Sequence, residues 1–180
     1  MRKKLFVSVV CLIVILSVPG VSYAVSLGGR WQSNPTYNSS GLVMQAQVNS
    51  AIQDWNSALS SVDSSITISY STAASATLGI TENFFGYTGW NAMGTPGPDP
   101  YSGTYTYAGI SLNRTYMDGF SNTKRRAIIA HEVGHILGLA HYNSSSPRSL
   151  MYYAGSSVYF DDWGIYSPQA FDVSELGLIY

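Results

Sequence analysis

The sequence predicts an α+β domain, and three patterns along the chain support that prediction. Apolar residues spaced by three or four positions within residues 41–59 are typical of an amphipathic helix. Apolar and polar residues alternate over 66–71 and again in short runs between 78 and 112, as in strands with one covered face. Two more helical patterns follow, one over 122–136 and one after Pro168. Strands in the middle and helices toward the end are typical of an α+β arrangement.

Composition excludes several classes of protein. The chain has 180 residues, of which 46% are hydrophobic and 11% are charged, with 9 Lys and Arg against 10 Asp and Glu. This much apolar surface argues against a disordered chain. The balanced charge offers no surface for a polyanion, so we expect no nucleic-acid partner. Because no repeat or long linker divides the sequence, one domain is expected.

The first residues have the features of a secretory signal peptide. A basic start at residues 2–4 precedes an apolar run over 5–18, and small residues at 22–24 are suited to cleavage. A membrane anchor is the alternative, but the run is shorter than the ~20 residues that a spanning helix needs. The sequence therefore predicts a signal peptide over 1–24 and a secreted, extracellular domain over 25–180, free of the membrane after cleavage.

All 3 histidines of the chain lie in one short segment, at His131, His135 and His141. On a helix, the first two project from the same side, one turn apart. Gly138 can adopt the left-handed conformation that ends a helix, which would bring His141 back to the same point. Three neutral imidazoles suit zinc and leave a fourth position open for water. The segment therefore predicts one catalytic zinc ion.

Glu132 follows the first of these histidines and is the candidate general base. Its carboxylate would lie close enough to the metal to take a proton from the attacking water. A lone histidine is most often a core residue, but this reading does not account for three histidines at metal-ligand spacing with a glutamate between them. The segment indicates metal-assisted hydrolysis.

Residues 131–141 match the HExxHxxGxxH signature of the metzincin zinc metallopeptidases, and the chain most resembles a secreted matrixin-type catalytic domain. In that family a methionine lies beneath the histidines, and Met151 within Ser149–Tyr153 resembles this turn. Asp172 resembles the helix aspartate that supports the turn. The resemblance implies a twisted five-stranded mixed sheet, three helices and a zinc cleft between upper and lower parts.

The resemblance also implies how a substrate binds. A peptide would lie extended along an antiparallel edge strand, for which residues 103–108 are the candidate. Residues 86–103 are rich in Pro and Gly and are expected to form a loop without regular structure. An aromatic pocket beside the zinc is expected from Tyr159, Phe160, Trp163 and Tyr166, with the small Ala127 leaving it open.

Some positions depart from the matrixin pattern. Tyr153 stands where astacin-like and serralysin-like relatives place a tyrosine that approaches the zinc or the oxyanion, but in a chain with 14 tyrosines a wall or surface residue is the simpler interpretation. No histidine remains for the second, structural zinc of many matrixins. Calcium is possible at Asp99, but a turn residue is the simpler interpretation, and we make no commitment to calcium.

The sequence thus predicts a monomeric, zinc-dependent endopeptidase that acts on protein or peptide substrates. A non-catalytic secreted module that binds zinc or a matrix polymer is the main alternative. A zinc hydrolase that acts on a non-peptide amide or ester is another, because the ligands alone do not distinguish it.

Overall fold

The computed structural model describes residues 26–73 and 75–180, so the predicted signal peptide lies outside the described residues. The elements in chain order are β1 (Gly29–Trp31), β2 (Thr36–Tyr37), α1 (Gln45–Ser61), β3 (Ser69–Tyr70), β4 (Leu78–Asn83), β5 (Ala92–Gly97), β6 (Gly103–Tyr105), β7 (Tyr107–Asn113), α2 (Arg114–Met117), α3 (Asn122–Ile136), a π-helix (Ser157–Asp162) and α4 (Ala170–Ile179). The three predicted helices correspond to α1, α3 and α4.

Five strands form one mixed sheet in the order β3-β2-β4-β7-β5. Neighbouring strands are parallel except at one edge, where β5 runs antiparallel to β7 and pairs Ala92 with Leu112. The predicted five-stranded mixed sheet is therefore confirmed. β1 and β6 pair in parallel as a separate two-stranded sheet.

The edge strand is not the one that the sequence predicted. It is β5, which lies inside the segment expected to be irregular, whereas β6 pairs with β1. Pro96 sits within β5 opposite Ala108. A proline lacks the N–H that a central strand needs, but an edge strand has one side free of partners, so β5 tolerates it. The Pro- and Gly-rich composition therefore predicted a loop, although the segment forms a strand at the edge of the sheet.

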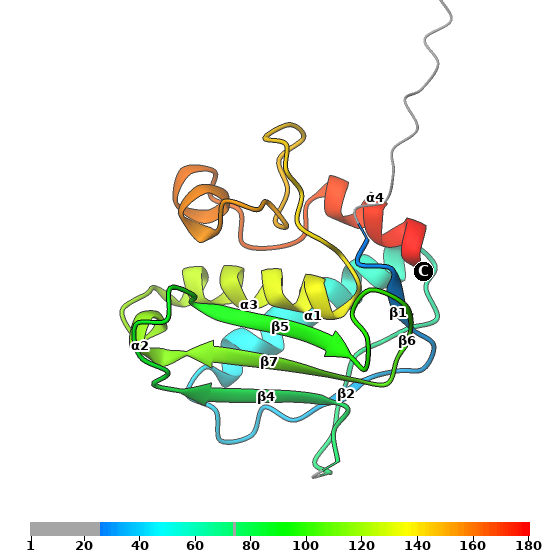
Figure 1. Cartoon of the computed structure of the whole chain (residues 1–180), viewed down its shortest axis with the longest axis horizontal. Helices are drawn as coiled ribbons and strands as arrows, with labels where there is room; N and C mark the ends of the chain where they lie inside the picture. Colours follow the sequence, from blue (N-terminus) through cyan, green and yellow to red (C-terminus); the bar gives the residue numbers. More distant parts are fainter. Residues whose placement is uncertain (1–25, 74) are drawn as a thin grey trace, which may run out of the picture.

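The helices α1 and α3 lie together on one face of the sheet (Figure 1). The predicted stripe on α1 is buried, including Val48, Ile52 and Trp55. The Trp55 indole N–H donates to the carbonyl oxygen of Ala130 in α3 at 2.7 Å. This bond satisfies a polar group inside the apolar layer and joins the two helices.

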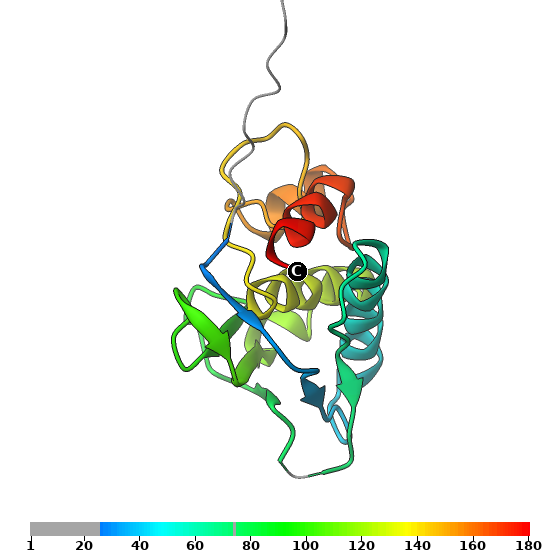
Figure 2. The same ribbon diagram turned by 90° about the vertical axis from the view of Figure 1, so that its right-hand side faces the viewer.

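The part of the chain after His141 lies above α3, on the side away from the sheet (Figure 2). It contains the π-helix and ends in α4, where Leu176 and Ile179 are buried and Val173 is half-buried. The helix α3 is therefore covered by the sheet below and by this segment above. No helix among the described residues has both the length and the apolar character needed to cross a membrane.

Candidate metal centre and substrate cleft

Local sequence explains where α3 begins and ends. The Ser121 hydroxyl caps the helix by accepting from the Lys124 N–H at 3.2 Å. At the other end, Gly138 has φ of +97°, and its N–H donates to the His135 carbonyl at 2.9 Å. A side chain on Gly138 would also place its Cβ 2.6 Å from the carbonyl oxygen of Gly29. Glycine is therefore required at this turn for both conformation and space.

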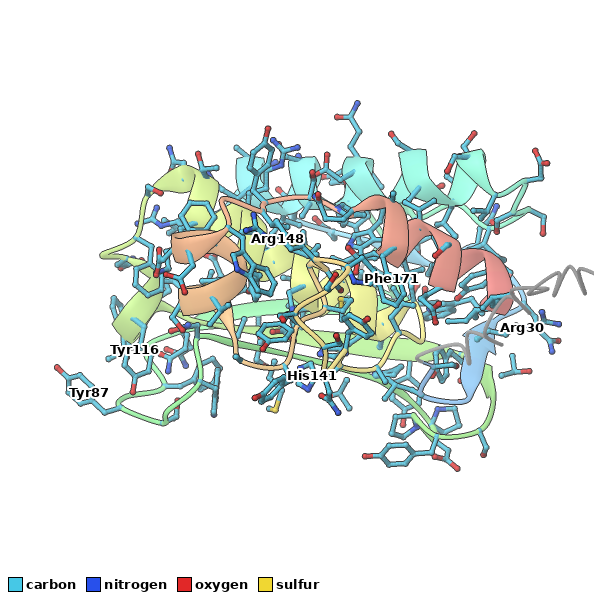
Figure 3. All side chains as sticks on the ribbon, turned by 90° about the horizontal axis from the view of Figure 1, so that it is seen from above. Arg30, Tyr87, Tyr116, His141, Arg148 and Phe171 are labelled. Atoms are coloured by element: carbon cyan, nitrogen blue, oxygen red, sulfur yellow. The ribbon has the colours of Figure 1, made fainter. Side chains whose placement is uncertain are left out.

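The turn brings the three imidazoles together. The Nε2 atom of His141 lies 3.1 Å from that of His131 and 3.1 Å from that of His135. The ligand atoms of all three residues lie within 4.8 Å of one another. Figure 3 shows His141 near the middle of the molecule, below the C-terminal segment. One ion could contact all three nitrogens at once.

Hydrogen bonds fix the outer nitrogen of two of these rings. Nδ1 of His131 lies 2.8 Å from the Leu150 carbonyl, and Nδ1 of His135 lies 2.8 Å from the Leu139 carbonyl. A carbonyl oxygen can only accept, so each Nδ1 carries the hydrogen and each Nε2 keeps a free lone pair. This is how metal-ligating histidines are usually oriented, and the donor set fits zinc.

Burial keeps these imidazoles neutral, the form that binds a metal. It lowers the pKa of His131 well below the ordinary value, lowers that of His135 to about 4, and lowers that of His141 as well. Burial also raises the pKa of the Glu132 carboxyl to about 7, and a hydrogen bond from the Gly94 N–H acts in the opposite direction.

The side chain of Met151 contacts α3 at Gly134, one residue before His135. Its buried thioether packs so closely against Gly134 that a Cβ there would collide with the sulfur. Asp172, at the start of α4, accepts from the Ser149 hydroxyl, from the Leu150 N–H at 2.9 Å and from the Met151 N–H at 3.4 Å. Because the Leu150 carbonyl in turn holds His131, α4 supports the centre through this turn.

Glu132 connects the helix to the opposite wall of the cleft. Its Oε2 accepts from the Gly94 N–H in β5 at 2.6 Å, and the whole residue is buried. A Cβ on Gly94 would lie 2.6 Å from the Glu132 carbonyl oxygen. Sequence reasoning missed Gly94, since a glycine in a Pro- and Gly-rich run carries no signal until β5 is placed beside α3.

The histidines and Glu132 face a cavity of about 470 Å³ that Trp90, Asn91, Ile128 and Tyr159 also line. The Tyr159 ring stacks on His131, with ring centroids 5.2 Å apart and an interplanar angle of 8°. The predicted aromatic pocket needs correction, because Tyr159 alone of the four aromatic residues lines this cavity.

The other three predicted pocket residues have different neighbours. Trp163 packs on Tyr152 with centroids 4.8 Å apart, Phe160 packs against the core, and Tyr166 lies beside the Arg126 guanidinium. Ala127 is fully buried, and the next residue, Ile128, lines the cavity instead. Ala127 therefore takes up no space in this cavity, and Ile128 is the residue of this part of α3 that faces it.

The structure also places Tyr153 and Asp99, the two remaining candidates. Tyr153 lines the same cavity, and 56% of its surface is exposed. Asp99 is exposed, and its carboxylate accepts from the Tyr101 N–H at 2.9 Å and from the Ser102 hydroxyl at 2.7 Å. These bonds are those of an Asx turn, which is the simpler of the two interpretations for Asp99.

A mixed sheet with one antiparallel edge and a helix that presents histidines to a cleft are the features of a zinc metallopeptidase. The matrixin family model matches residues 31–162, which include the histidines, Glu132 and Met151. The chain therefore belongs to the matrixin family, whose members are zinc-dependent endopeptidases. No curated protein gave a match.

Proposed function

We propose that the protein is a secreted endopeptidase that uses zinc and Glu132 to hydrolyse peptide bonds. The observation that supports this most is the convergence of three imidazole Nε2 atoms beside a buried carboxylate in an open cleft. Structural zinc sites usually have four protein ligands, whereas catalytic sites have three and leave the fourth position to water or substrate.

His131, His135 and His141 would hold the ion. A bound zinc would supply Lewis-acid chemistry that activates water and polarises the peptide carbonyl. The chain's own contribution is orientation, because Nδ1–H···O bonds to Leu150 and Leu139 aim two of the rings.

Glu132 would move the proton. Its Oε2 is held by the Gly94 N–H, which leaves Oε1 to receive a proton from the attacking water and deliver it to the leaving amine. The main-chain bond from β5 fixes the carboxylate, so that its position does not depend on the substrate.

The substrate would lie along β5. Within the described residues β5 pairs only with β7, so its outer edge can form main-chain hydrogen bonds with an extended peptide. Trp90, Ile128 and Tyr159 would then contact the side chain after the scissile bond. We expect cleavage before a medium or large apolar residue, and a peptide-library profile that favours charged residues there would contradict this.

The proposed export rests on the sequence alone. The basic start, apolar run and small residues within 1–24 support a signal peptide, and 25–180 would then be the exported catalytic domain.

Substituting Glu132 with Gln tests the proposed mechanism. The variant keeps the size of the side chain but cannot accept the proton, so we expect kcat/KM on a quenched fluorescent peptide to fall about 10²–10⁴-fold. Zinc content, measured by metal analysis, should be unchanged. Full activity in the Glu132→Gln variant would refute the general-base assignment. No chelator-sensitive hydrolysis by the unsubstituted protein would refute the peptidase itself.

A further inference from the structure

We infer that residues 84–91, here called the aromatic loop, extend the substrate cleft and bind apolar or aromatic side chains of the substrate beyond the residue that follows the scissile bond. This inference rests on the proposed function and adds a second contact region to it. The loop connects β4 to the edge strand β5.

The side chains of the aromatic loop face solvent to an unusual degree. Tyr87 is 90% exposed, Phe84 is 62% exposed and Phe85 is 39% exposed. Single exposed aromatics are common, but several within one short segment form the kind of apolar patch that marks a binding surface. The loop therefore leaves uncovered the apolar groups that a merely structural segment would bury.

The polar backbone of the loop faces inward instead, around the fully buried Asn113. The Asn113 Nδ2 donates to the Gly86 carbonyl at 2.9 Å, the Thr88 hydroxyl at 3.0 Å and the Trp90 carbonyl at 3.3 Å. Its Oδ1 accepts from the Phe85 N–H at 3.2 Å. One buried amide thus satisfies backbone groups along the loop and fixes its shape.

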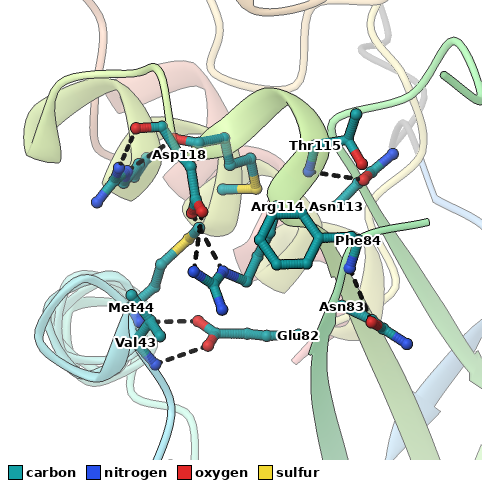
Figure 4. A network of polar contacts seen from close by, with 11 residues as sticks. Val43, Met44, Glu82, Asn83, Phe84, Asn113, Arg114, Thr115 and Asp118 are labelled. Carbon is teal, nitrogen blue, oxygen red and sulfur yellow. Dashed lines mark hydrogen bonds and ion pairs between the residues drawn. The ribbon is translucent and has the colours of Figure 1, made fainter. Parts of the chain in front are cut away.

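Residues of α2 hold the loop from its other side. The Thr115 hydroxyl accepts from the Gly86 N–H at 3.0 Å, and the Tyr116 hydroxyl accepts from the Gly89 N–H at 3.1 Å. The Arg114 guanidinium lies 4.6 Å from the centre of the Phe84 ring, and Figure 4 shows it between this ring and Asp118. The rings are therefore placed before any ligand arrives, which lowers the entropy cost of binding.

The aromatic loop is continuous with the cleft. Gly89, Trp90 and Asn91 line the same cavity as His131 and Glu132, and the Phe85 ring packs on Trp90 with centroids 5.2 Å apart. Tyr87 and Tyr116 pack edge to face at 5.9 Å and lie at one end of the molecule, beyond the cleft (Figure 3). Trp90 belongs to the pocket proposed for the substrate residue after the scissile bond. The next residues of the substrate would therefore lie across the aromatic loop.

Aromatic rings bind aromatic and other flat apolar side chains by stacking and edge-to-face contact. The occupant that fits is therefore the substrate polypeptide itself, on the C-terminal side of the cleaved bond, with Phe, Tyr or Trp a few residues downstream. Polar or acidic residues there would gain nothing from these rings.

Three quenched fluorescent peptides with one common core test the inference. The first is the core alone, the second adds a downstream extension with two Phe residues, and the third adds the same extension upstream. We expect kcat/KM of the downstream peptide to exceed that of the core about fivefold, mainly through a lower KM, since each aromatic contact adds modestly to binding. The upstream extension should give no comparable gain.

Variants connect the gain to the loop. The double substitution Phe84→Ser and Tyr87→Ser should abolish the advantage of the downstream peptide and leave cleavage of the core unchanged. Tyr101→Ser, which removes a ring that is 72% exposed outside the loop, is the matched control and should keep the advantage. Equal rates for core and downstream peptides, or an advantage that survives the double substitution, would overturn the inference while the peptidase assignment stands. Failure to cleave any of the peptides would overturn both.

Discussion

The two walls of the cleft are built in different ways. On one wall, α3 and the turn at Gly138 position the histidines. Ring-to-carbonyl hydrogen bonds hold the buried His131 and the half-buried His135, and the turn brings the exposed His141 to them. On the other wall, β5 and the aromatic loop touch the helix through main chain at Gly94, and several of their side chains face solvent.

This difference separates chemistry from recognition. The imidazoles and Glu132 need fixed positions, which a helix with buried neighbours and the tight turn after it provide. Binding an extended chain needs free main-chain groups and exposed rings, which an edge strand and its loop provide. The two walls meet at the hydrogen bond between Glu132 and Gly94. Substitutions at this contact should therefore affect both the chemical step and substrate binding.

Removing one imidazole should have the largest effect, because it takes away one of the three proposed zinc ligands. In His141→Ala we expect zinc affinity to fall by at least about a hundredfold, because loss of an outer-shell partner alone costs about 10–100-fold. Activity should fall below detection at limiting zinc. Zinc titration and a peptide assay measure this, with Asn143→Ala, exposed in the same loop, as the control. Retained stoichiometric zinc in His141→Ala would contradict the site.

Substituting Gly94 with Ala, which adds a methyl group where β5 contacts Glu132, should have the next largest effect on activity. In Gly94→Ala the new Cβ would press on the Glu132 carbonyl, so α3 and β5 must separate. A displacement of about 1 Å at a reacting group can cost about a hundredfold in rate, and we expect a fall in kcat of that order.

Gly109→Ala in β7 is the matched control, because a Cβ there meets no atom within 4 Å. Steady-state kinetics of the two variants should differ in kcat, with Gly109→Ala close to the unsubstituted protein. Equal kcat values for the two variants would show that the close approach of Gly94 is unimportant.

The close packing of the turn at Gly138 can be tested by measuring the free energy of unfolding. Both Gly138 and Gly41 have positive φ, but a Cβ on Gly41 meets nothing within 4 Å, whereas one on Gly138 collides with the Gly29 carbonyl. Gly41→Ala should lower the free energy of unfolding by about 1–2 kcal/mol from backbone strain alone. Gly138→Ala should lower it by about 1–3 kcal/mol more, from overpacking. Urea unfolding of the two variants measures the difference, and equal losses would contradict the collision.

The smallest effect is expected at Tyr153. If its hydroxyl contacts the reacting carbonyl, kcat in Tyr153→Phe should fall severalfold with little change in KM. The side chain is more than half exposed, so the fold should be unaffected. Unchanged turnover in Tyr153→Phe would remove any role in the transition state and leave Tyr153 as a wall residue.

The helix wall could be predicted from sequence because its information is local. His131, His135 and Gly138 belong to one helix and its end, so spacing alone determines how they project. Met151 and Asp172 required the family resemblance, since a buried methionine or a helix aspartate has many ordinary explanations.

The strand wall could not be predicted, because its residues gain meaning only through distant pairing. Pro96 is unfavourable in a central strand, so its segment could be recognised as a strand only once β5 was placed at the edge of the sheet. Asn113 gave no sign that its amide would organise a loop more than twenty residues earlier in the chain. Which residue of α3 lines the cleft, here Ile128, depends on how the helix is rotated against the sheet.

X-ray absorption at the zinc edge, on the purified protein with its metal content determined, tests the central claim most directly. The account predicts one zinc ion bound by three imidazole nitrogens and one oxygen from solvent, with the solvent displaced by a hydroxamate peptide. A protein that binds no zinc, or a zinc ion whose fourth ligand is another side chain and which ignores the hydroxamate, would contradict it.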